Sequence, residues 1–480
     1  MKKRIICLLL TALMTMPLVA CFKKEEPDKY DYNMSNYITL PSDYKTHSID
    51  LEIDSMQAAI DTYLVEAVRE VGDQYQYKVS RGDDIYVDIS VYKEQIIPVE
   101  GGDPIKKRGD KIESLSKTNY LIEDLGKSPL PYAVEVDIIN GNLKIKDILE
   151  RRYSYDKLED FAPSEYEGQN LYFVIKIMNK KVELGDVVSV SYKGYHIDAN
   201  GEKLKDDAGK EKAPFDTSDG AYFFPGSKLA IDDFENSLVG LLINEFYTFT
   251  ATFPDDYSDE SFRGKKVLFE ATVKGIYTPP IYNNSFIKTW FPDYNTTTEF
   301  EASLKKEFIM AQMYDYVLMN SVIKDYPSRE YDEHKKSIED ASASFEQYYG
   351  YSFDEYIKKA YNMTRDEYIK SQMKTELVYY ALSKENDLVP TDAMLTNEKA
   401  NLISYYKNLY MQQQALDENT ALKTATEFVD NLGESYIYEN VMYNMVEDFL
   451  YKTAQEYVNE IPATYESISR VIAKSEAEIK

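Results

Sequence analysis

Two kinds of hydrophobic pattern divide the chain. Between about Val79 and Tyr277, short apolar runs alternate with polar residues and are separated by Gly and Pro, which predicts antiparallel strands joined by turns. From about Asn283 onward, apolar residues recur at helical spacing in long runs. We therefore expect an α+β, multidomain protein whose C-terminal part is all helical.

The strand pattern is clearest between Gly185 and Tyr277. A first strand is predicted from Gly185 to Tyr195, and a closing strand ends the segment from Phe253 to Val273. Between them, the residues from Ala230 to Leu241 fit one short amphipathic helix. This order predicts an antiparallel sheet that wraps around a short helix.

A matching set of residues upstream indicates an internal repeat. Gly82 to Val87 parallels Gly185 to Val190, and Gly168 to Phe173 parallels Gly264 to Phe269, at a nearly constant offset. Chance recurrence of Gly-Asp strand starts is the alternative explanation. We expect a degenerate first copy of the same domain.

The residues between these two matched segments support the repeat, and they also indicate that its first copy is degenerate. Gly126 and Glu135 are spaced like Gly226 and Glu235. The first copy has Ile89 where the second has Tyr192, and it has no Phe-Asp pair. A copy with these losses is expected to lack a pocket.

Helical spacing appears in two further places. An extended piece begins near Tyr37, and the helix after it has its apolar residues at Ile60, Tyr63, Leu64, Ala67 and Val71. In the C-terminal part, one stripe running toward Pro327 comprises Phe300, Leu304, Phe308, Ala311, Tyr314 and Leu318. Helix breaks are predicted near residues 326–328, Gly350, residues 386–390 and Gly433.

The N-terminus has the pattern of a lipoprotein signal. Lys2 to Arg4 precede an apolar run that is too short for a membrane span and ends in Leu18-Val19-Ala20-Cys21. We expect residues 1–20 to be removed and Cys21 to carry the lipid. The alternative is an ordinary secretory signal that contains a cysteine. Residues 21–36 are polar and are predicted to be a solvated, lipidated tether.

Composition narrows the possible functions. Cys7 would leave with the signal, so a mature chain has one cysteine and no internal disulfide. The net charge of −28 argues against nucleic acid or an anionic lipid face as the main partner. The three histidines are far apart in the sequence, and the motifs for nucleotide binding and for hydrolase catalysis are missing. We therefore expect neither a metal nor a cofactor. The 44 tyrosines fit half-buried packing positions, and some could contact peptides.

The motif from Phe253 to Val273 resembles the FKBP-type domain of the trigger factor family. It joins a Phe-Pro-acidic-acidic-Tyr turn to a closing strand through Gly264-Lys265-Lys266, and the Phe215-Asp216-Thr217-Ser218 segment lies upstream. The helical half resembles the family's chaperone domain more weakly. The resemblance implies peptidyl-prolyl isomerisation, whereas the family's ribosome-docking motif is missing, which implies no ribosome partner.

The resemblance also implies a set of site residues. They would form an aromatic pocket for the prolyl ring, with the backbone N–H of Ile231 meeting the substrate carbonyl. The positions that match are Tyr192, Phe215, Asp216, Ile231, Phe234, Tyr257 and Phe269. Taken singly, each aromatic is better explained as core filling, so the prediction depends on their coincidence with Asp216. The alternative for Asp216 is a turn or capping carboxylate.

Three departures from the family pattern put the pocket geometry and peptide preference in question. Asp232-Asp233 follows Ile231, Tyr257 lies one residue nearer its proline than in many members, and residues 199–214 form a long polar insertion.

These observations predict a membrane-anchored foldase outside the cytoplasm. The resemblance implies a surface of the Gram-positive kind, and a Gram-negative periplasmic lipoprotein, which would carry the same signal, is the alternative. Its partners would be unfolded chains with X-Pro bonds and, through Cys21, the membrane. The predicted domains are 37–180 (extended segment, helix and degenerate copy), 181–278 (isomerase) and 279–480 (helical chaperone). The alternative is a non-catalytic holding chaperone or surface-binding lipoprotein that keeps the FKBP fold as a scaffold.

Overall fold

The computed structural model describes residues 29–154, 164–166 and 168–464. The predicted signal peptide and Cys21 lie outside these residues. In the described part, no helix is long and apolar enough to cross a membrane. The described chain folds as two compact units: one joins the residues up to Met56 with Thr298–Pro462, and the other is built on Gln57–Thr297. Residues 37–56, predicted to belong with the β domains, thus fold with the helical unit.

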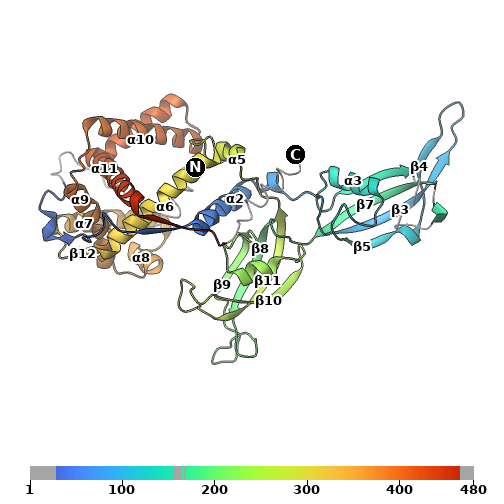
Figure 1. Ribbon diagram of the computed structural model, residues 1–480, viewed down its shortest axis with the longest axis horizontal. Helices are drawn as coiled ribbons and strands as arrows, with labels where there is room; N and C mark the ends of the chain where they lie inside the picture. The colour runs from blue at the N-terminus through green and yellow to red at the C-terminus, as the bar shows by residue number, and fades with distance from the viewer. Residues whose placement is uncertain (1–28, 155–163, 167, 465–480) are drawn as a thin grey trace. The chain divides into compact units, whose positions relative to one another are not determined.

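The second unit contains a sheet formed by the residues from 187 to 277 (Figure 1). Its strand order is β10-β11-β8-β9, and all neighbours are antiparallel. The short helix α4 contacts β10, so the predicted sheet wrapped on a helix is confirmed. The elements are β8 (Val187–His196), β9 (Asp216–Phe223), α4 (Asp232–Leu238), β10 (Phe246–Thr252) and β11 (Lys266–Tyr277). We call this region the second β domain.

The residues from 85 to 180 form a sheet of the same topology, which we call the first β domain. Its order is β4-β3-β7-β6, with β5 paired to β3. Strands β6, β7, β3 and β5 therefore occupy the places of β10, β11, β8 and β9. The elements are β3 (Ile85–Ile97), β4 (Ile105–Lys111), β5 (Lys117–Ile122), α3 (Tyr132–Asn140), β6 (Ile148–Ser154) and β7 (Asn170–Lys180).

The two β domains also share their strand register. Phe173 pairs with Val91 in the first domain, and Phe269 pairs with Gly194 in the second. Alternation puts Ile85, Val87, Ile89 and Val91 of β3 into the core. Because one slipped residue would reverse every side chain, equal registers support a true repeat.

One glutamate has the same structural role in both domains. Glu135, buried on α3, accepts hydrogen bonds from the N–H groups of Gly126 and Ser128 at 3.0 and 2.9 Å. Glu235, buried on α4, accepts them from Gly226, Lys228 and Ala230 at 3.0, 3.1 and 2.8 Å. Each carboxylate therefore shapes the loop before its helix, and this shared role agrees with the matched spacing of the two Gly and Glu pairs.

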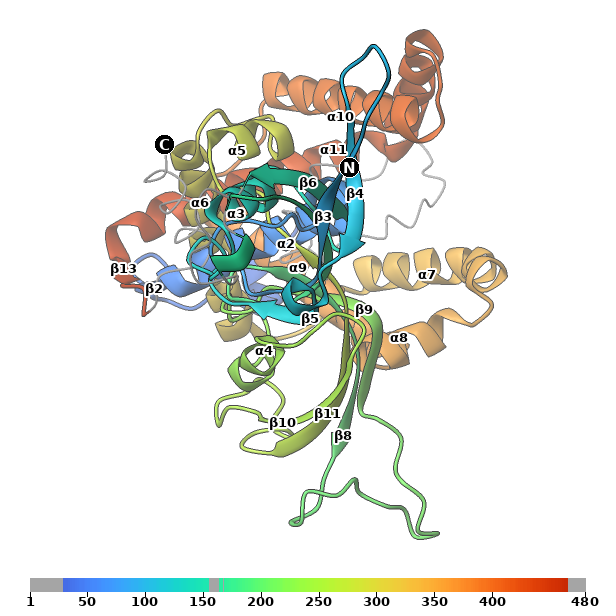
Figure 2. The ribbon, with the colours of Figure 1, turned by 90° about the vertical axis from the view of Figure 1, so that its right-hand side faces the viewer.

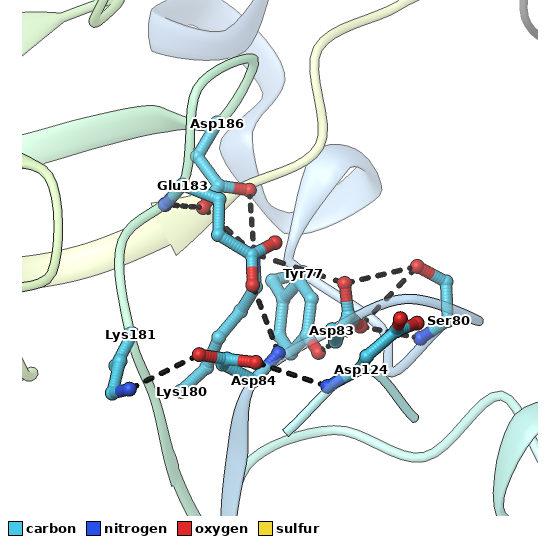
Figure 3. Close-up of polar contacts among 9 residues, drawn as sticks. All are labelled: Tyr77, Ser80, Asp83, Asp84, Asp124, Lys180, Lys181, Glu183 and Asp186. Atoms are coloured by element: carbon cyan, nitrogen blue, oxygen red, sulfur yellow. Dashed lines mark hydrogen bonds and ion pairs between the residues drawn. The ribbon is translucent and has the colours of Figure 1, made fainter. Parts of the chain in front are cut away.

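A buried lysine joins the two β domains (Figure 3). The Lys180 ammonium, whose side chain is 2% exposed, lies 2.8 Å from Asp186, 2.9 Å from Glu183 and 3.9 Å from Asp83. Asp83 and Asp186 are equivalent, since each accepts the N–H three residues earlier, at 2.6 and 2.8 Å. Burial alone would lower the pKa of Lys180, but Asp186, Asp83 and Glu183 hold it above its usual value.

Two helices complete the second unit. Helix α2 (Ile53–Tyr75) buries Ile60, Tyr63, Leu64 and Ala67, as predicted. The backbone at Val71 is not helical and Val71 is only half-buried, so the predicted stripe ends one turn early. The ring of Tyr63 lies 5.0 Å from that of Phe291, which follows α5 (Asn284–Trp290).

The first unit is mainly helical. Its helices are α6 (Thr297–Asn320), α7 (Ser328–Tyr349), α8 (Phe353–Tyr361), α9 (Arg365–Glu385), α10 (Asp392–Gln413) and α11 (Glu418–Ala454). Short strands add to it: β1 (Ile38–Thr39) pairs with β12 (Val322–Ile323), and β2 (Ile49–Glu52) pairs in parallel with β13 (Val458–Ile461). The short 3-10 turns of the described chain are Met34–Asn36, Glu113–Leu115, Ser164–Tyr166 and Gln455–Tyr457.

The helix breaks lie where predicted, but the buried face of α6 differs from the predicted apolar stripe. Gly350 ends α7 with a left-handed backbone, and Gly433 kinks α11 at φ 85°. Helix α6 ends at Asn320, and the predicted stripe is wrong beyond Leu304 because the helix turns a neighbouring face to the core. The residues that α6 buries are Phe300, Leu304, Ile309, Met313 and Val317.

The N-terminal segment is a strap across the helical unit rather than a solvated tether as far as residue 36. Tyr30 is 0% exposed, and its ring lies 4.7 Å from that of Tyr380. Its N–H donates to Glu330 at 3.1 Å, and its hydroxyl donates to Glu376 at 2.8 Å. The Lys29 ammonium lies 2.8 Å from Glu439. The strap thus donates hydrogen bonds to carboxylates from α7 and α9 and forms an ion pair with one from α11.

Candidate active site

The second β domain contains an aromatic cavity of about 820 Å³. All seven residues predicted for the site line it: Tyr192, Phe215, Asp216, Ile231, Phe234, Tyr257 and Phe269. They come from β8, β9, α4 and its N-cap, β11 and the segments next to them. The fold thus gathers residues that are up to 77 positions apart, from Tyr192 to Phe269.

Edge-to-face aromatic contacts build the floor of the cavity. The rings of Phe234 and Phe269 lie 4.7 Å apart at 72°, and both side chains are buried. Tyr192 and Phe215 stand 6.0 and 6.1 Å from Phe269, also edge-on. Aromatic edges and faces carry opposite partial charges, so these contacts fix the rings and leave an apolar, water-poor surface.

Gly194 makes room for this floor. A Cβ atom at this position would lie 2.6 Å from the Phe215 ring and 2.9 Å from the Phe269 ring. The backbone of β8 therefore has to come this close to the two rings without a side chain.

Asp216 is held by Tyr192. The Tyr192 hydroxyl donates to Asp216 Oδ2 at 2.7 Å, and the Thr217 N–H donates to Oδ1 at 2.8 Å. Burial and then the Asp216 carboxylate raise the pKa of Tyr192, so its hydroxyl stays protonated at neutral pH. The carboxylate is exposed on the cavity wall.

Ile231 supplies a backbone donor. It is the N-cap of α4, with φ −63° and ψ 135°, and its carbonyl accepts from Phe234 and Glu235. Among the described residues, its N–H forms no backbone–backbone hydrogen bond. Glu235 fixes the preceding loop, so this donor is held at the edge of the aromatic floor.

Tyr257 belongs to a separate part of the wall. Its ring contacts Phe253 at 4.7 Å, and Phe253 reaches Phe215 at 6.3 Å. The position of Tyr257 close to its proline thus places it near the rim, away from the buried floor.

Sequence analysis missed several residues of the site. Phe223 lies 4.8 Å from Phe234 and 5.8 Å from Tyr192, and Phe262 lies 5.1 Å from Phe215. Phe253 could have been found, because it begins the Phe-Pro motif, and Phe223 sits on a strand pattern. Nothing local marks Phe262, whose loop folds back onto Phe215.

The rim of the cavity is acidic. Asp232, Asp233 and Asp255 are exposed there, and Lys228 is the one basic residue among those that line it. The Thr252 N–H donates to Asp233 Oδ2 at 2.9 Å, which ties α4 to the end of β10. The Asp232-Asp233 departure from the family pattern therefore gives the rim its charge.

The first β domain keeps the scaffold but has different residues at the equivalent positions. Val91, which occupies the place of Gly194, is 0% exposed, and Val134 replaces Phe234. Pro131 stands where Ile231 does, at φ −54° and ψ 132°, and has no N–H. The first domain thus lacks the donor, and it has a valine side chain where the second has none.

The described residues contain no cluster of three or more side chains suited to a metal ion. His196 contacts Phe215 and Phe262 instead, at ring distances of 4.9 and 5.3 Å. The chemistry available in the cavity is therefore that of apolar surface, one backbone donor and carboxylates.

Comparison with known proteins gives the family context. No family model matches the chain. Trigger factor of Clostridium botulinum strain Eklund 17B is 26% identical over 289 residues, covering 55% of this chain and 63% of the relative. Trigger factor of Caldicellulosiruptor saccharolyticus is 23% identical over 369 residues, covering 72% and 78%. The chain thus spans less than two thirds of the first of these relatives.

Solved structures with partial likeness carry related titles. One concerns promiscuous substrate recognition by the trigger factor chaperone, at 14% identity and a TM-score of 0.19, covering 66% of this chain and 88% of the other. Another contains the three FKBP domains of wheat FKBP73, at 12% identity and a TM-score of 0.14, covering 42% and 91%.

Proposed function

Because the chain is trigger factor-like and has an FKBP-type domain, we propose that it is a membrane-anchored foldase outside the cytoplasm. Its second β domain isomerises X-Pro bonds, and its helical unit holds unfolded clients. The observation that carries the catalytic part is the aromatic cavity with the Ile231 N–H at its edge.

The proposed mechanism follows from the chemistry of the peptide bond. Rotation about it crosses a barrier of about 18 to 20 kcal/mol because resonance is lost on twisting. A twisted imide is less polar than a planar one, so the surface of Phe234 and Phe269 stabilises it better than water does. The Ile231 N–H holds the carbonyl before the proline while the prolyl ring stays fixed. No nucleophile or metal is required.

Isomerase activity tests this proposal. The full chain is assayed for cis-trans exchange of an X-Pro peptide, beside the Phe269→Ala and Asp216→Ala variants. We expect catalysis in the native chain and a loss of at least about tenfold in Phe269→Ala, since about 1.4 kcal/mol of transition-state stabilisation would be lost. Phe173→Ala, at the same register in the first β domain, is the matched control and should keep the activity. An inactive native chain contradicts the proposal.

A second candidate, a holding chaperone without catalysis, is favoured by helix α10. None of its residues is buried, although it carries partly exposed Tyr406, Tyr410 and Met411. Such flexible and amphipathic side chains suit loose contact with many sequences. The test is suppression of aggregation of an unfolded client by the Phe269→Ala variant. Retained holding separates the two activities, and lost holding in a folded variant contradicts the holding role.

The membrane anchor is proposed from Cys21 and the residues before it. Detergent phase partitioning and mass analysis of the mature N-terminus test it. We expect a diacylglycerol mass on Cys21 and a water-soluble Cys21→Ala variant. An unmodified Cys21 in a membrane-free protein would refute the anchor.

A further inference from the structure

A second cavity lies beside the aromatic one. It has a volume of about 730 Å³ and is lined by residues that include His196, Leu204, Thr250, Lys265 and Lys266. Its sheet side comes from the ends of β8 and β10 and the start of β11. Its other side is the 199–214 insertion, which projects beyond the strand ends in Figure 2.

The insertion is a built wall, because hydrogen bonds fix it to β8 and to itself. The Leu204 N–H donates to His196 O at 2.9 Å, and the Phe215 N–H donates to Gly194 O at 2.8 Å, so both ends are tied to the strand. Asp198 turns the chain by accepting from the N–H groups of Asn200 and Glu202 at 2.8 and 3.0 Å. The cavity therefore has a fixed side formed by the insertion.

The two cavities share a wall. The His196 ring, on the second cavity, lies 4.9 Å from the Phe215 ring, which lines the first. Phe215 is in turn 6.1 Å from Phe269 on the aromatic floor. The Phe253 N–H donates to Lys265 O at 3.0 Å, which connects the opposite edges. At about 3.3 Å per residue, an extended peptide covers these two ring steps in about three residues.

The two cavities carry opposite charge. Carboxylates dominate the rim of the first, as described above. Lys265 and Lys266 are exposed on the second, and within the described residues neither forms an ion pair. Asp198 also lines this cavity and stays negatively charged, because its backbone hydrogen bonds lower its pKa, but the two lysines outnumber it. An anionic side chain is thus attracted to the second cavity and repelled by the rim of the first.

We propose that the second cavity is a client subsite for an Asp or Glu side chain about three residues from the proline bound in the aromatic cavity. This proposal rests on the isomerase function proposed above and names its substrate class: X-Pro segments with a carboxylate at one side. The pairing of charges also orients the client chain, since a carboxylate beside the acidic rim is disfavoured.

Peptide scanning tests the subsite. Peptides with one X-Pro bond carry Glu or Gln at each position up to four residues on either side of the proline. For each peptide, kcat/KM for isomerisation and Kd by fluorescence anisotropy are measured with the full chain at low salt. We expect one position, about three residues away, where Glu improves both constants about fivefold over Gln, and we expect 0.5 M salt to remove the gain.

Variants assign the preference to the cavity. Lys265→Gln with Lys266→Gln should abolish the Glu gain, so that the Glu and Gln peptides give equal constants at every position. Lys274→Gln, an exposed lysine on β11 that lines neither cavity, should retain the gain. A Glu gain of less than twofold at every position, or one that survives the double substitution, overturns the proposal.

The two measurements separate the two proposals. If no peptide is isomerised, the isomerase function fails, and the Glu-to-Gln ratio of Kd values still decides the subsite. If isomerisation occurs without a charge preference, the subsite alone is rejected.

Discussion

The two β domains have the same scaffold and differ in the side chains that face its interior. Both have the same strand order, the same register and a glutamate that shapes the loop before the helix. In the first, the buried Val91 and Val134 stand where the second has Gly194 and Phe234. The comparison teaches that a shared hydrogen-bonded frame can carry different side chains at the positions that line the cavity of the second domain.

The largest expected effect comes from putting the first domain's valine into the second. In Gly194→Val, the new Cβ would meet the Phe215 and Phe269 rings, so the aromatic floor must move. We expect isomerase activity to fall by more than about 100-fold, and overpacking to reduce the free energy of unfolding by about 1 to 3 kcal/mol.

The reverse exchange is the control. Val91→Gly should reduce stability by about 2 to 4 kcal/mol through a cavity in the first domain and leave isomerisation unchanged. Normal activity in a folded Gly194→Val protein, shown by circular dichroism, would mean that the cavity is not the site.

The next largest effect tests the backbone N–H of Ile231 as a hydrogen-bond donor. Ile231→Pro removes one N–H at a backbone angle that proline accepts, as Pro131 shows in the first domain. We expect kcat/KM to fall about tenfold, the value of one hydrogen bond, with little change in the melting temperature. Ile231→Ala restores the N–H and should recover most of this loss. Equal activity of the Pro and Ala variants would eliminate the donor role.

The glutamates should behave alike, because their role is structural in both domains. Glu135→Gln and Glu235→Gln each place an amide among backbone N–H donors, which should reduce the free energy of unfolding by about 2 kcal/mol. Chemical denaturation measures both. Only Glu235→Gln should also reduce activity, because its loop lines the cavity. Activity loss in Glu135→Gln would show that the domains are coupled.

The smallest expected effect is a pH dependence at Asp186. Burial raises its pKa from 3.8 to about 6. Between these values the folded state binds the proton more tightly than the unfolded state, so this group's contribution to stability grows as pH falls. Relative to Asp186→Asn, the native chain should gain on the order of 1 kcal/mol between pH 7 and pH 5. Equal slopes in both proteins would show that Asp186 does not titrate in this range.

Local signals predicted the β domains well. The Gly-Asp turns, the Gly-to-Glu spacing and strand alternation are short-range features, so the repeat could be identified from order and spacing, whereas the seven lining residues followed from the resemblance to the family's motifs. The negative charge of the cavity rim could be predicted from Asp232 and Asp233 in the sequence. In contrast, the insertion was recognised only as polar, because its cavity depends on contacts with strand ends that lie elsewhere in the sequence.

Contacts between residues that are far apart in the sequence explain the other differences between the predictions and the structure. Lys29 and Tyr30 sit in a polar segment that looks solvated, and their partners Glu330, Glu376 and Glu439 are 300 or more residues away. Helix α6 has apolar residues on neighbouring faces, and only the tertiary packing decides that Ile309 rather than Phe308 is buried.

The strap has a geometric consequence for a lipidated chain. Eight peptide units separate Cys21 from Lys29, and a fully extended chain of that length covers at most about 28 Å. A diacylglycerol on Cys21 would therefore keep the point where Lys29 enters the helical unit within about one domain diameter of the bilayer surface. The protein would then meet its clients close to the bilayer surface, where secreted chains emerge. The lipidated segment would be too short to let it reach much farther.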